Sequence, residues 1–156
     1  MRTLFLRRIN VINIRKLQSA DKDVYVSMVK TFYSSEAVLH EIPDSFIEST
    51  FSELMDRDTY AEGFIFEDGA KAVGYGLISK TFSQEAGGMV VWVEEVYIGK
   101  AYRSKGIGTA FFSFLEENYP AARYRLETEP DNDSAARLYG RLGYKKLGYV
   151  SMIKGN

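Results

Sequence analysis

Residues 103–109 read Arg-Ser-Lys-Gly-Ile-Gly-Thr. They follow an apolar stretch at 89–98 and lead into a second stretch, at 107–115, whose apolar residues recur at helical spacing. An apolar run bounded by turn residues predicts a strand, and apolar residues at every third or fourth position predict a helix. We therefore expect a glycine-containing turn that joins a buried strand to a helix N-terminus. Backbone amides at a helix start attract anions, and glycine lets the backbone approach a phosphate closely. The turn is a candidate phosphate-binding site.

Three known phosphate-binding patterns use such a turn. A P-loop requires Gly-x-x-x-x-Gly-Lys-Ser/Thr, but here Lys105 precedes Gly106. A dinucleotide fingerprint requires Gly-x-Gly-x-x-Gly/Ala, but Phe111 occupies its last position. The third pattern, Arg-x-x-Gly-x-Gly after an apolar strand, fits Arg103 to Gly108 and resembles the pyrophosphate-binding motif of the GCN5-related N-acetyltransferase (GNAT) superfamily. The structural alternative is a glycine-softened turn that binds nothing.

A second segment resembles the other signature of the same superfamily, Asn-x-x-Ala-x-x-x-Tyr-x-x-x-Gly-Phe/Tyr. Residues 132–144 read Asn-Asp-Ser-Ala-Ala-Arg-Leu-Tyr-Gly-Arg-Leu-Gly-Tyr. Asn132 can cap a helix, Ala135 is small enough for close packing at the helix start, and Gly143 can end the helix. Alone, the segment could be an ordinary capped amphipathic helix. Its position about thirty residues after the first motif, with a strand between, matches the superfamily.

The rest of the chain predicts an α/β domain with a mixed, mostly antiparallel central sheet flanked by helices, in the GNAT-like order β-α-α-β-β-β-α-β-α-β. The helix expected at 20–35 has Val24, Met28, Val29 and Phe32 at helical spacing, and Asp68-Gly69 predicts a hairpin. The expected strands are 11–14, 64–66, 72–82, 89–98, 123–128 and 144–153, and the other expected helices begin near 44, 107 and 133.

Length and composition are those of one globular domain, which we assign to residues 1–156, with 1–10 as a short leader. The chain has no cysteine and one histidine, so disulfides, thiolate metal sites, a cysteine nucleophile and a Ser-His-Asp triad are not expected. We expect no metal cofactor. No apolar run reaches the length of a membrane span, and we expect a cytoplasmic protein.

The resemblance implies that the protein binds acetyl-CoA, or another acyl-CoA, as a co-substrate. Relatives place the pantetheine arm against a strand edge that here corresponds to 96–98, and the pyrophosphate on the amides of the turn. The cofactor-binding residues implied in this way are Val96, Tyr97, Ile98, Arg103, Ser104, Lys105, Gly106, Ile107, Gly108, Thr109, Asn132, Ala135 and Tyr139.

The resemblance also implies direct acyl transfer to an amine in a ternary complex. Tyr139 matches the tyrosine that acts as general acid toward the leaving sulfur. The general base is left between three carboxylates: Glu95 and Glu94 are nearly equal candidates, and Glu127 follows. Because side chains alternate across a strand, at most one of Glu94 and Glu95 faces the acceptor unless a bulge intervenes.

The acceptor is left open by the sequence. Between residues 36 and 68 stand ten acids and one base, a formal charge of −9, which leaves +8 for the remainder. This stretch is either a solvated acidic helix face or a wall that attracts a cationic acceptor, such as a small polyamine or a basic peptide end. Nucleic acid and membrane partners are not expected. Homodimers are common among relatives, but no sequence feature decides the oligomeric state. The alternative function is a non-catalytic acyl-CoA-binding or sensing module.

Overall fold

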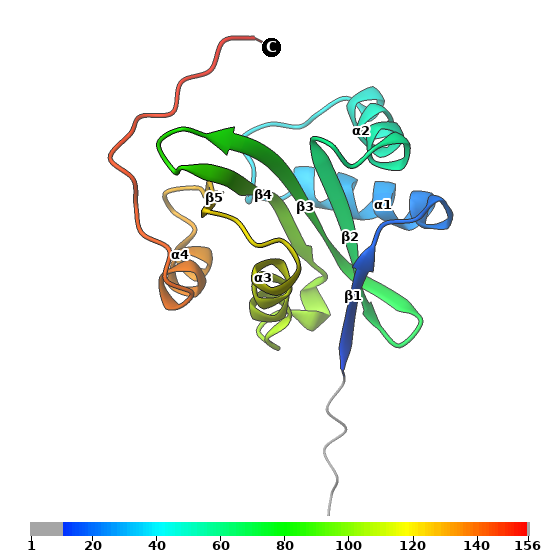
Figure 1. The fold of residues 1–156 in the computed structure, drawn as a ribbon. Coiled ribbons are helices and arrows are strands. Elements are labelled where there is room, and N and C mark those ends of the chain that lie inside the picture. Colours follow the sequence, from blue (N-terminus) through cyan, green and yellow to red (C-terminus); the bar gives the residue numbers. More distant parts are fainter. Residues whose placement is uncertain (1–10, 156) are drawn as a thin grey trace, which may run out of the picture.

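The structure, a computed structural model, describes residues 11–155, so the expected leader at 1–10 lies outside the described residues. Its strands form one five-stranded sheet (Figure 1). The strands are β1 (Ile12–Lys16), β2 (Ala61–Asp68), β3 (Lys71–Ser83), β4 (Gly88–Ile98) and β5 (Arg123–Leu126). The helices are α1 (Lys22–Tyr33), α2 (Asp44–Asp56), α3 (Ile107–Asn118) and α4 (Asp133–Arg141), with short 3-10 turns at Ser19–Asp21 and Lys100–Tyr102.

The sheet follows chain order, β1-β2-β3-β4-β5. The first four strands pair antiparallel, and only β4 and β5 run parallel. Gly69 has a φ of 61° at the hairpin between β2 and β3, where a left-handed residue is needed and glycine adopts it without steric cost. The expectation of a mixed, mostly antiparallel sheet with flanking helices is confirmed.

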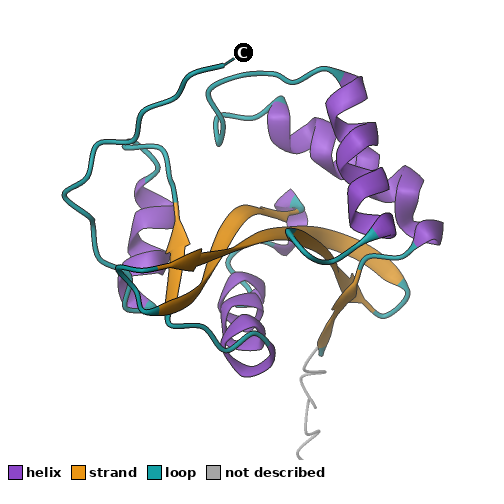
Figure 2. Cartoon of the chain, turned by 45° about the horizontal axis from the view of Figure 1, so that its top comes forward, coloured by secondary structure: helices purple, strands orange, loops and turns teal. Residues whose placement is uncertain are grey.

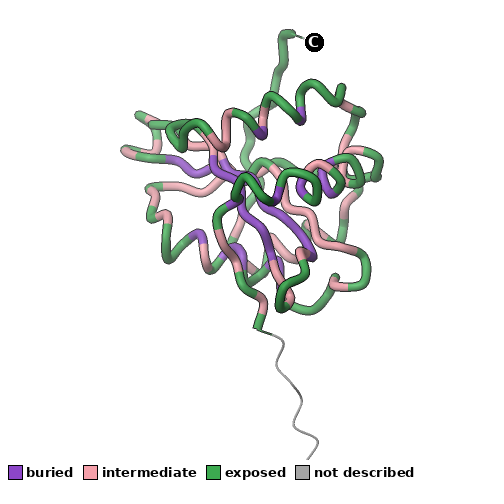
Figure 3. Tube along the Cα trace, turned by 90° about the vertical axis from the view of Figure 1, so that its right-hand side faces the viewer, coloured by how far each residue is buried: buried purple, intermediate pink, exposed green. Residues whose placement is uncertain are grey.

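The two faces of the sheet carry separate hydrophobic cores. The first core lies under α3 and joins Phe111, Phe112 and Leu115 to sheet residues such as Phe64 and Phe66. The second lies under α1 and α2 and contains Tyr25, Val29, Ile47, Phe51, Ile65 and Tyr75. Figure 2 shows α3 on the side of the sheet opposite α1 and α2, and Figure 3 shows the buried residues concentrated along the central strands. Alternation along β2 therefore sends neighbouring side chains into different cores.

The contact between α3 and β3 depends on one glycine. A Cβ placed on Gly76 would lie 2.4 Å from Cζ of Phe111, well inside van der Waals contact. The missing side chain lets the Phe111 ring rest directly on the strand. This packing places the N-terminus of α3, and the turn before it, beside the end of β4.

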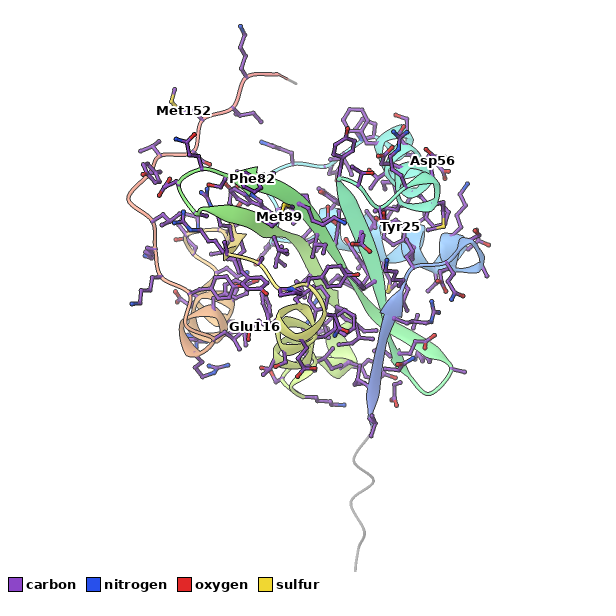
Figure 4. The ribbon with its side chains drawn as sticks, in the orientation of Figure 1. Tyr25, Asp56, Phe82, Met89, Glu116 and Met152 are labelled. Atoms are coloured by element: carbon purple, nitrogen blue, oxygen red, sulfur yellow. The ribbon has the colours of Figure 1, made fainter. Side chains whose placement is uncertain are left out.

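The helix predicted at 20–35 forms as α1, and its predicted buried stripe holds at Met28 and Val29, with Phe32 half-buried, but fails at Val24. Val24 is exposed, whereas Tyr25 is 1% exposed, together with buried Met28 and Val29. Figure 4 labels Tyr25 where α1 meets the sheet. Periodicity alone could not choose between two adjacent apolar residues. None of the helices between residues 11 and 155 has the length and apolarity needed to span a lipid bilayer.

The prediction of a strand at 144–153 is wrong. From Lys145 to Gly155 the structure has no strand, and Val150, Met152 and Ile153 are at least 85% exposed (Figure 4). Ser151 anchors the segment by donating a hydrogen bond to Glu127 at 2.8 Å. A β-prone sequence becomes a strand only when it pairs with a neighbour, and the outer edge of β5 has no partner among the described residues.

Candidate active site

The candidate site lies where β4 and β5 separate. The parallel pairing runs only from Val90 with Arg123 to Val93 with Leu126. On its other side, β4 stays paired with β3 as far as Ile98. Between Glu94 and Ile98, the edge of β4 that faces away from β3 therefore has no strand partner within residues 11–155. The predicted cofactor-arm residues Val96, Tyr97 and Ile98 lie on this edge, where free backbone groups could pair with an extended ligand.

The turn after β4 presents unpaired amides. Ser104 and Gly106 have φ values of 59° and 83°. The first intrahelical bond of α3 runs from the Ala110 N–H to the Gly106 carbonyl at 2.9 Å, and no side chain caps the helix. The amides of Ile107, Gly108 and Thr109 therefore have no acceptor in the helix. A left-handed residue before a helix N-terminus builds a concave nest of N–H groups that suits an anion.

Charged side chains flank this turn. Arg103 donates a hydrogen bond from Nε to the carbonyl of Ile98 at 2.9 Å, which ties the turn to the end of β4. Lys105 lies with its Nζ 5.3 Å from the ring centre of Tyr102. Both side chains are exposed. The structure therefore brings Arg103 to Thr109 together as one positively charged loop at the open edge.

The segment 132–144 forms the helix that its pattern predicts. Asn132 caps α4 by accepting a hydrogen bond from the Ala135 amide at 3.1 Å. At the other end Gly143 has a φ of 88°, and the amides of Gly143 and Tyr144 bond to the carbonyls of Gly140 and Tyr139. This is the Schellman ending that a C′ glycine allows. The α4 helix is close to the candidate phosphate-binding turn at 103–109, because a Cβ on Gly108 would lie 3.2 Å from Leu138.

Tyr139 lies on the inner side of α4. Its ring packs edge-on against Phe112 at 5.6 Å and lies 6.0 Å from the ring of Tyr144. Burial raises the pKa of Tyr139, so the phenol stays protonated at neutral pH. Within the described residues its hydroxyl makes no hydrogen bond, which leaves it available to donate to a substrate atom.

A β-bulge separates the two adjacent glutamates. Leu77 pairs with Glu95 and Ile78 pairs with Val93, so Glu94 is the extra residue. Glu94 is exposed and accepts a short hydrogen bond from the Ser79 hydroxyl. Glu95 is directed instead to the face that α1 covers, where it meets Tyr33 and Tyr75. Glu127 follows the last residue of β5 and is exposed.

The surroundings of Glu95 differ from those of the other two carboxylates. Burial raises the pKa of Glu95, hydrogen bonds from Tyr33 and Tyr75 oppose that rise, and the charge of Glu94 adds to it. A carboxylate whose pKa lies above its usual range can take a proton near neutral pH. Of the three base candidates, Glu95 alone is half-buried and lies at the separation of β4 and β5, whereas Glu94 and Glu127 are exposed.

Tyr33 and Tyr75 were not predicted as site residues. For Tyr33 the sequence held a signal, because Tyr25, Val29 and Tyr33 recur at four-residue spacing and so share one face of the first helix. For Tyr75 it held none, because the register between β3 and β4 brings Tyr75 to Glu95, and the sequence pattern does not fix that register.

The acidic stretch is largely neutralised. Seven of its ten acids make ion pairs with basic side chains: Asp44, Glu48, Glu53, Asp56, Asp58, Glu62 and Glu67. Glu36 and Glu41 belong to the loop between α1 and α2 and make no ion pair with any residue in the described part of the chain. The charge that remains to act on a ligand is therefore concentrated in this loop.

Comparison with known proteins agrees with this geometry. The chain is 26% identical over 150 residues to the thialysine N-epsilon-acetyltransferase of Mus musculus, covering 86% of this chain and 84% of the relative. A possible acetyltransferase from Clostridium difficile 630 superposes with a TM-score of 0.78 at 20% identity, covering 94% of this chain and 98% of that one. The aminoglycoside N-acetyltransferase AAC(6')-Iy with CoA gives 0.78 at 16% identity, covering 96% and 98%.

The match to a family model covers most of the domain. The model of the Acetyltransferase (GNAT) family matches residues 24–144, from α1 through the end of α4. This range includes the open edge of β4, the candidate phosphate-binding turn at 103–109 and Tyr139. The chain therefore belongs to the GNAT family and is an acetyl-CoA-dependent N-acetyltransferase.

Proposed function

We propose that the protein transfers an acetyl group from acetyl-CoA directly to the primary amine of a small cationic acceptor, with both substrates bound together. The observation that carries this proposal is the separation of β4 from β5 after Val93. The proposal is supported by an unpaired strand edge on β4 that contains the half-buried Glu95 and ends close to the N-terminal amides of α3, where a Cβ on Gly108 would lie 3.8 Å from Ile98. The absence of cysteine from the chain is consistent with transfer that does not use a cysteine acyl-enzyme.

On the cofactor side, the residues present fit acetyl-CoA. The edge at 96–98 offers backbone groups to an amide-containing arm, and the amides of 104–109 offer donors to phosphates. Arg103 and Lys105 add positive charge beside those amides. Asn132 and Ala135 start the helix that lies next to this turn.

On the proton side, Glu95 and Tyr139 have complementary roles. An alkyl ammonium with an ordinary pKa must lose a proton before its nitrogen can attack, and Glu95 takes that proton directly or through water. As the nitrogen bonds to the acetyl carbon, the carbon–sulfur bond breaks and the sulfur takes the proton of the Tyr139 hydroxyl. The nitrogen then loses its second proton, which returns through water to the Tyr139 oxygen and leaves the neutral amide. Glu94 and then Glu127 are the next candidates for the base.

The acceptor is proposed to be cationic because of the loop between α1 and α2. Glu36 and Glu41 stand there without ion-pair partners in the described part of the chain, next to the helix that carries Tyr33. The thialysine and aminoglycoside acetyltransferases named above take acceptors with free amino groups, by their names. A small polyamine or amino-acid-like diamine has the corresponding chemistry.

A CoA-release assay with acetyl-CoA tests the proposal against polyamines, aminoglycosides, amino acids and basic peptides. We expect turnover with cationic acceptors, together with a rise in melting temperature on addition of acetyl-CoA. Turnover confined to neutral or anionic amines would contradict the cationic acceptor. Stabilisation by acetyl-CoA without turnover on any amine would favour an acyl-CoA-binding module instead.

A further inference from the structure

The carboxylate of Glu95 is held at both of its oxygens by tyrosine hydroxyls. Tyr33 donates to Oε1 at 2.5 Å, and Tyr75 donates to Oε2 at 2.6 Å. The two tyrosines come from different elements, since Tyr33 is the last residue of α1 and Tyr75 lies in β3. The carboxylate is therefore fixed in rotation as well as in position, because each oxygen has its own donor.

The hydroxyls are themselves held by packed rings. The Tyr75 ring is fully buried, lies 5.3 Å from that of Tyr25 and stacks on that of Tyr97 at 5.8 Å. The Tyr33 ring packs edge-on against Phe32 at 5.3 Å. The Tyr75 ring, packed in this way, has few alternative rotamers, so its hydroxyl stays directed at Glu95. The Tyr33 hydroxyl reaches the same carboxylate from the half-buried end of α1.

An ionised carboxylate oxygen can accept more than one hydrogen bond. One tyrosine on each oxygen therefore leaves room for a water or an ammonium group to approach from the open side. A donated hydrogen bond also favours the charged form of a carboxyl, which burial would otherwise disfavour. The arrangement meets two requirements of a half-buried base, which are a fixed direction and a carboxyl group that is ionised when the amine arrives.

We propose that Tyr33 and Tyr75 are positioning residues that hold Glu95 as the proton acceptor for the incoming amine. This inference rests on the proposed function, in which Glu95 is the base. The titratable groups that face Glu95 are Tyr25 and Tyr33 from α1, Tyr75 from β3 and Glu94 from β4. Glu94 opposes the ionised form, Tyr25 makes no hydrogen bond to Glu95 within residues 11–155, and the two donors act in the favourable direction.

The test is the pH dependence of kcat/KM in Tyr33→Phe and Tyr75→Phe, measured with a cationic acceptor. Each substitution keeps the ring and removes one donor to the charged form. We expect the acidic limb of the profile to move up by about one pH unit in each variant. At a pH well above this limb, kcat should recover only in part, because the carboxyl is then ionised again but lacks one of the two donors that fix its direction.

A matched control is Tyr119→Phe. Tyr119 also donates a hydrogen bond to a buried carboxylate, Glu62 at 3.0 Å, but on the face of the sheet that α3 covers. Loss of this hydrogen bond should lower the stability of the protein, as loss of the Tyr33 or Tyr75 hydrogen bond does, but it should leave the pH profile of kcat/KM unchanged. If Tyr75→Phe does not fold, Tyr33→Phe still tests the proposal, since Tyr33 is only half-buried at a helix end.

A second readout does not depend on turnover. In protein labelled with 13C at the glutamate carboxyl carbons, Glu95→Gln identifies the Glu95 signal, whose titration can then be followed in each variant. An upward shift in Tyr33→Phe supports the inference, and an unchanged titration overturns it. Failure of the proposed function is a different result, in which Glu95→Gln keeps full activity; the two tyrosines would then have no base to position.

Discussion

At the scale of single residues, Tyr139 and Glu95, the proposed general acid and general base, should have separable effects on kinetics. Tyr139→Phe keeps the ring against Phe112 and removes only the hydroxyl. We expect kcat to fall by about a hundredfold or more, with the KM for acetyl-CoA changed less than about twofold, because the proton is needed only as the sulfur leaves. Steady-state kinetics with both substrates varied would measure this.

Tyr144→Phe is the matched control for Tyr139→Phe. The Tyr144 ring lies in the same aromatic group, 5.6 Å from Phe112, and Tyr144 has no assigned role in the reaction. The Tyr144→Phe enzyme should therefore have the same kcat as the parent. An unchanged kcat in Tyr139→Phe, or an equal loss in both variants, would contradict the general-acid role.

Glu95 should define the acidic limb of the rate profile. Burial raises its pKa, so the base is lost as pH falls through that raised value, and activity falls with it. In Glu95→Gln we expect kcat/KM to drop by about a hundredfold at neutral pH and the limb to disappear. Glu116→Gln, an exposed carboxylate on α3 labelled in Figure 4, should behave as the parent. A larger loss in Glu94→Gln or Glu127→Gln would move the base to that residue.

At the scale of elements, the turn before α3 should be sensitive to backbone conformation alone. A Cβ on Gly106 would meet nothing within 4 Å, so Gly106→Ala acts only through the φ of 83°. A left-handed alanine costs about 1–2 kcal/mol, and relief of that strain would turn amides away from the nest. We expect a KM for acetyl-CoA raised by about tenfold, measured at saturating acceptor.

Gly140→Ala is the matched control: it is also a glycine-to-alanine change, but it should raise the stability of the protein. Gly140 lies within α4, has no left-handed φ and also has open space around its Cβ. Alanine is the better helix former by about 1 kcal/mol, so this variant should melt at a higher temperature with an unchanged KM. Equal effects of the two substitutions on KM would argue against a special role for the turn.

The elements also show which features a sequence can supply. The turn, the cap at Asn132 and the glycine end at Gly143 are local, and each was predicted because its partners lie within a few residues. The bulge at Glu94 and the Tyr33 and Tyr75 contacts of Glu95 depend on pairing between distant segments, which periodicity does not encode. The strand expected at 144–153 failed for the same reason, because an apolar pattern does not name its partner.

At the scale of the whole molecule, charge distribution predicts a salt effect on acceptor binding. The net charge is −1, but most acids of the 36–68 stretch are paired, which leaves Glu36 and Glu41 to attract a cation. Raising the salt concentration from about 0.05 M to about 0.5 M shortens the screening length from about 14 Å to about 4 Å. We expect the KM of a cationic acceptor to rise several-fold.

The control for the salt effect uses the same enzyme with a substrate of different charge. A neutral amine analogue should show a flat response across the same range. Glu36→Gln and Glu41→Gln together should reduce the salt dependence for the cation. If the KM of the cation is independent of salt, the acidic loop does not act on the acceptor.

The order of strands in the sheet has a consequence for how the molecule assembles. Strands β2, β3 and β4 follow one another directly in the chain and pair as a meander, whereas α1 and α2 separate β1 from β2, and β5 joins β4 through a crossover that includes α3. Contacts between segments close in sequence form faster than distant ones, so the β2–β4 meander can gather before the elements on either side of it dock. Tyr75 and Glu95 belong to this meander, while Tyr33 and Tyr139 lie on helices that join it from distant parts of the chain. The active site would thus be completed in stages during folding, with the enzyme becoming active only when α1 and α4 have both docked.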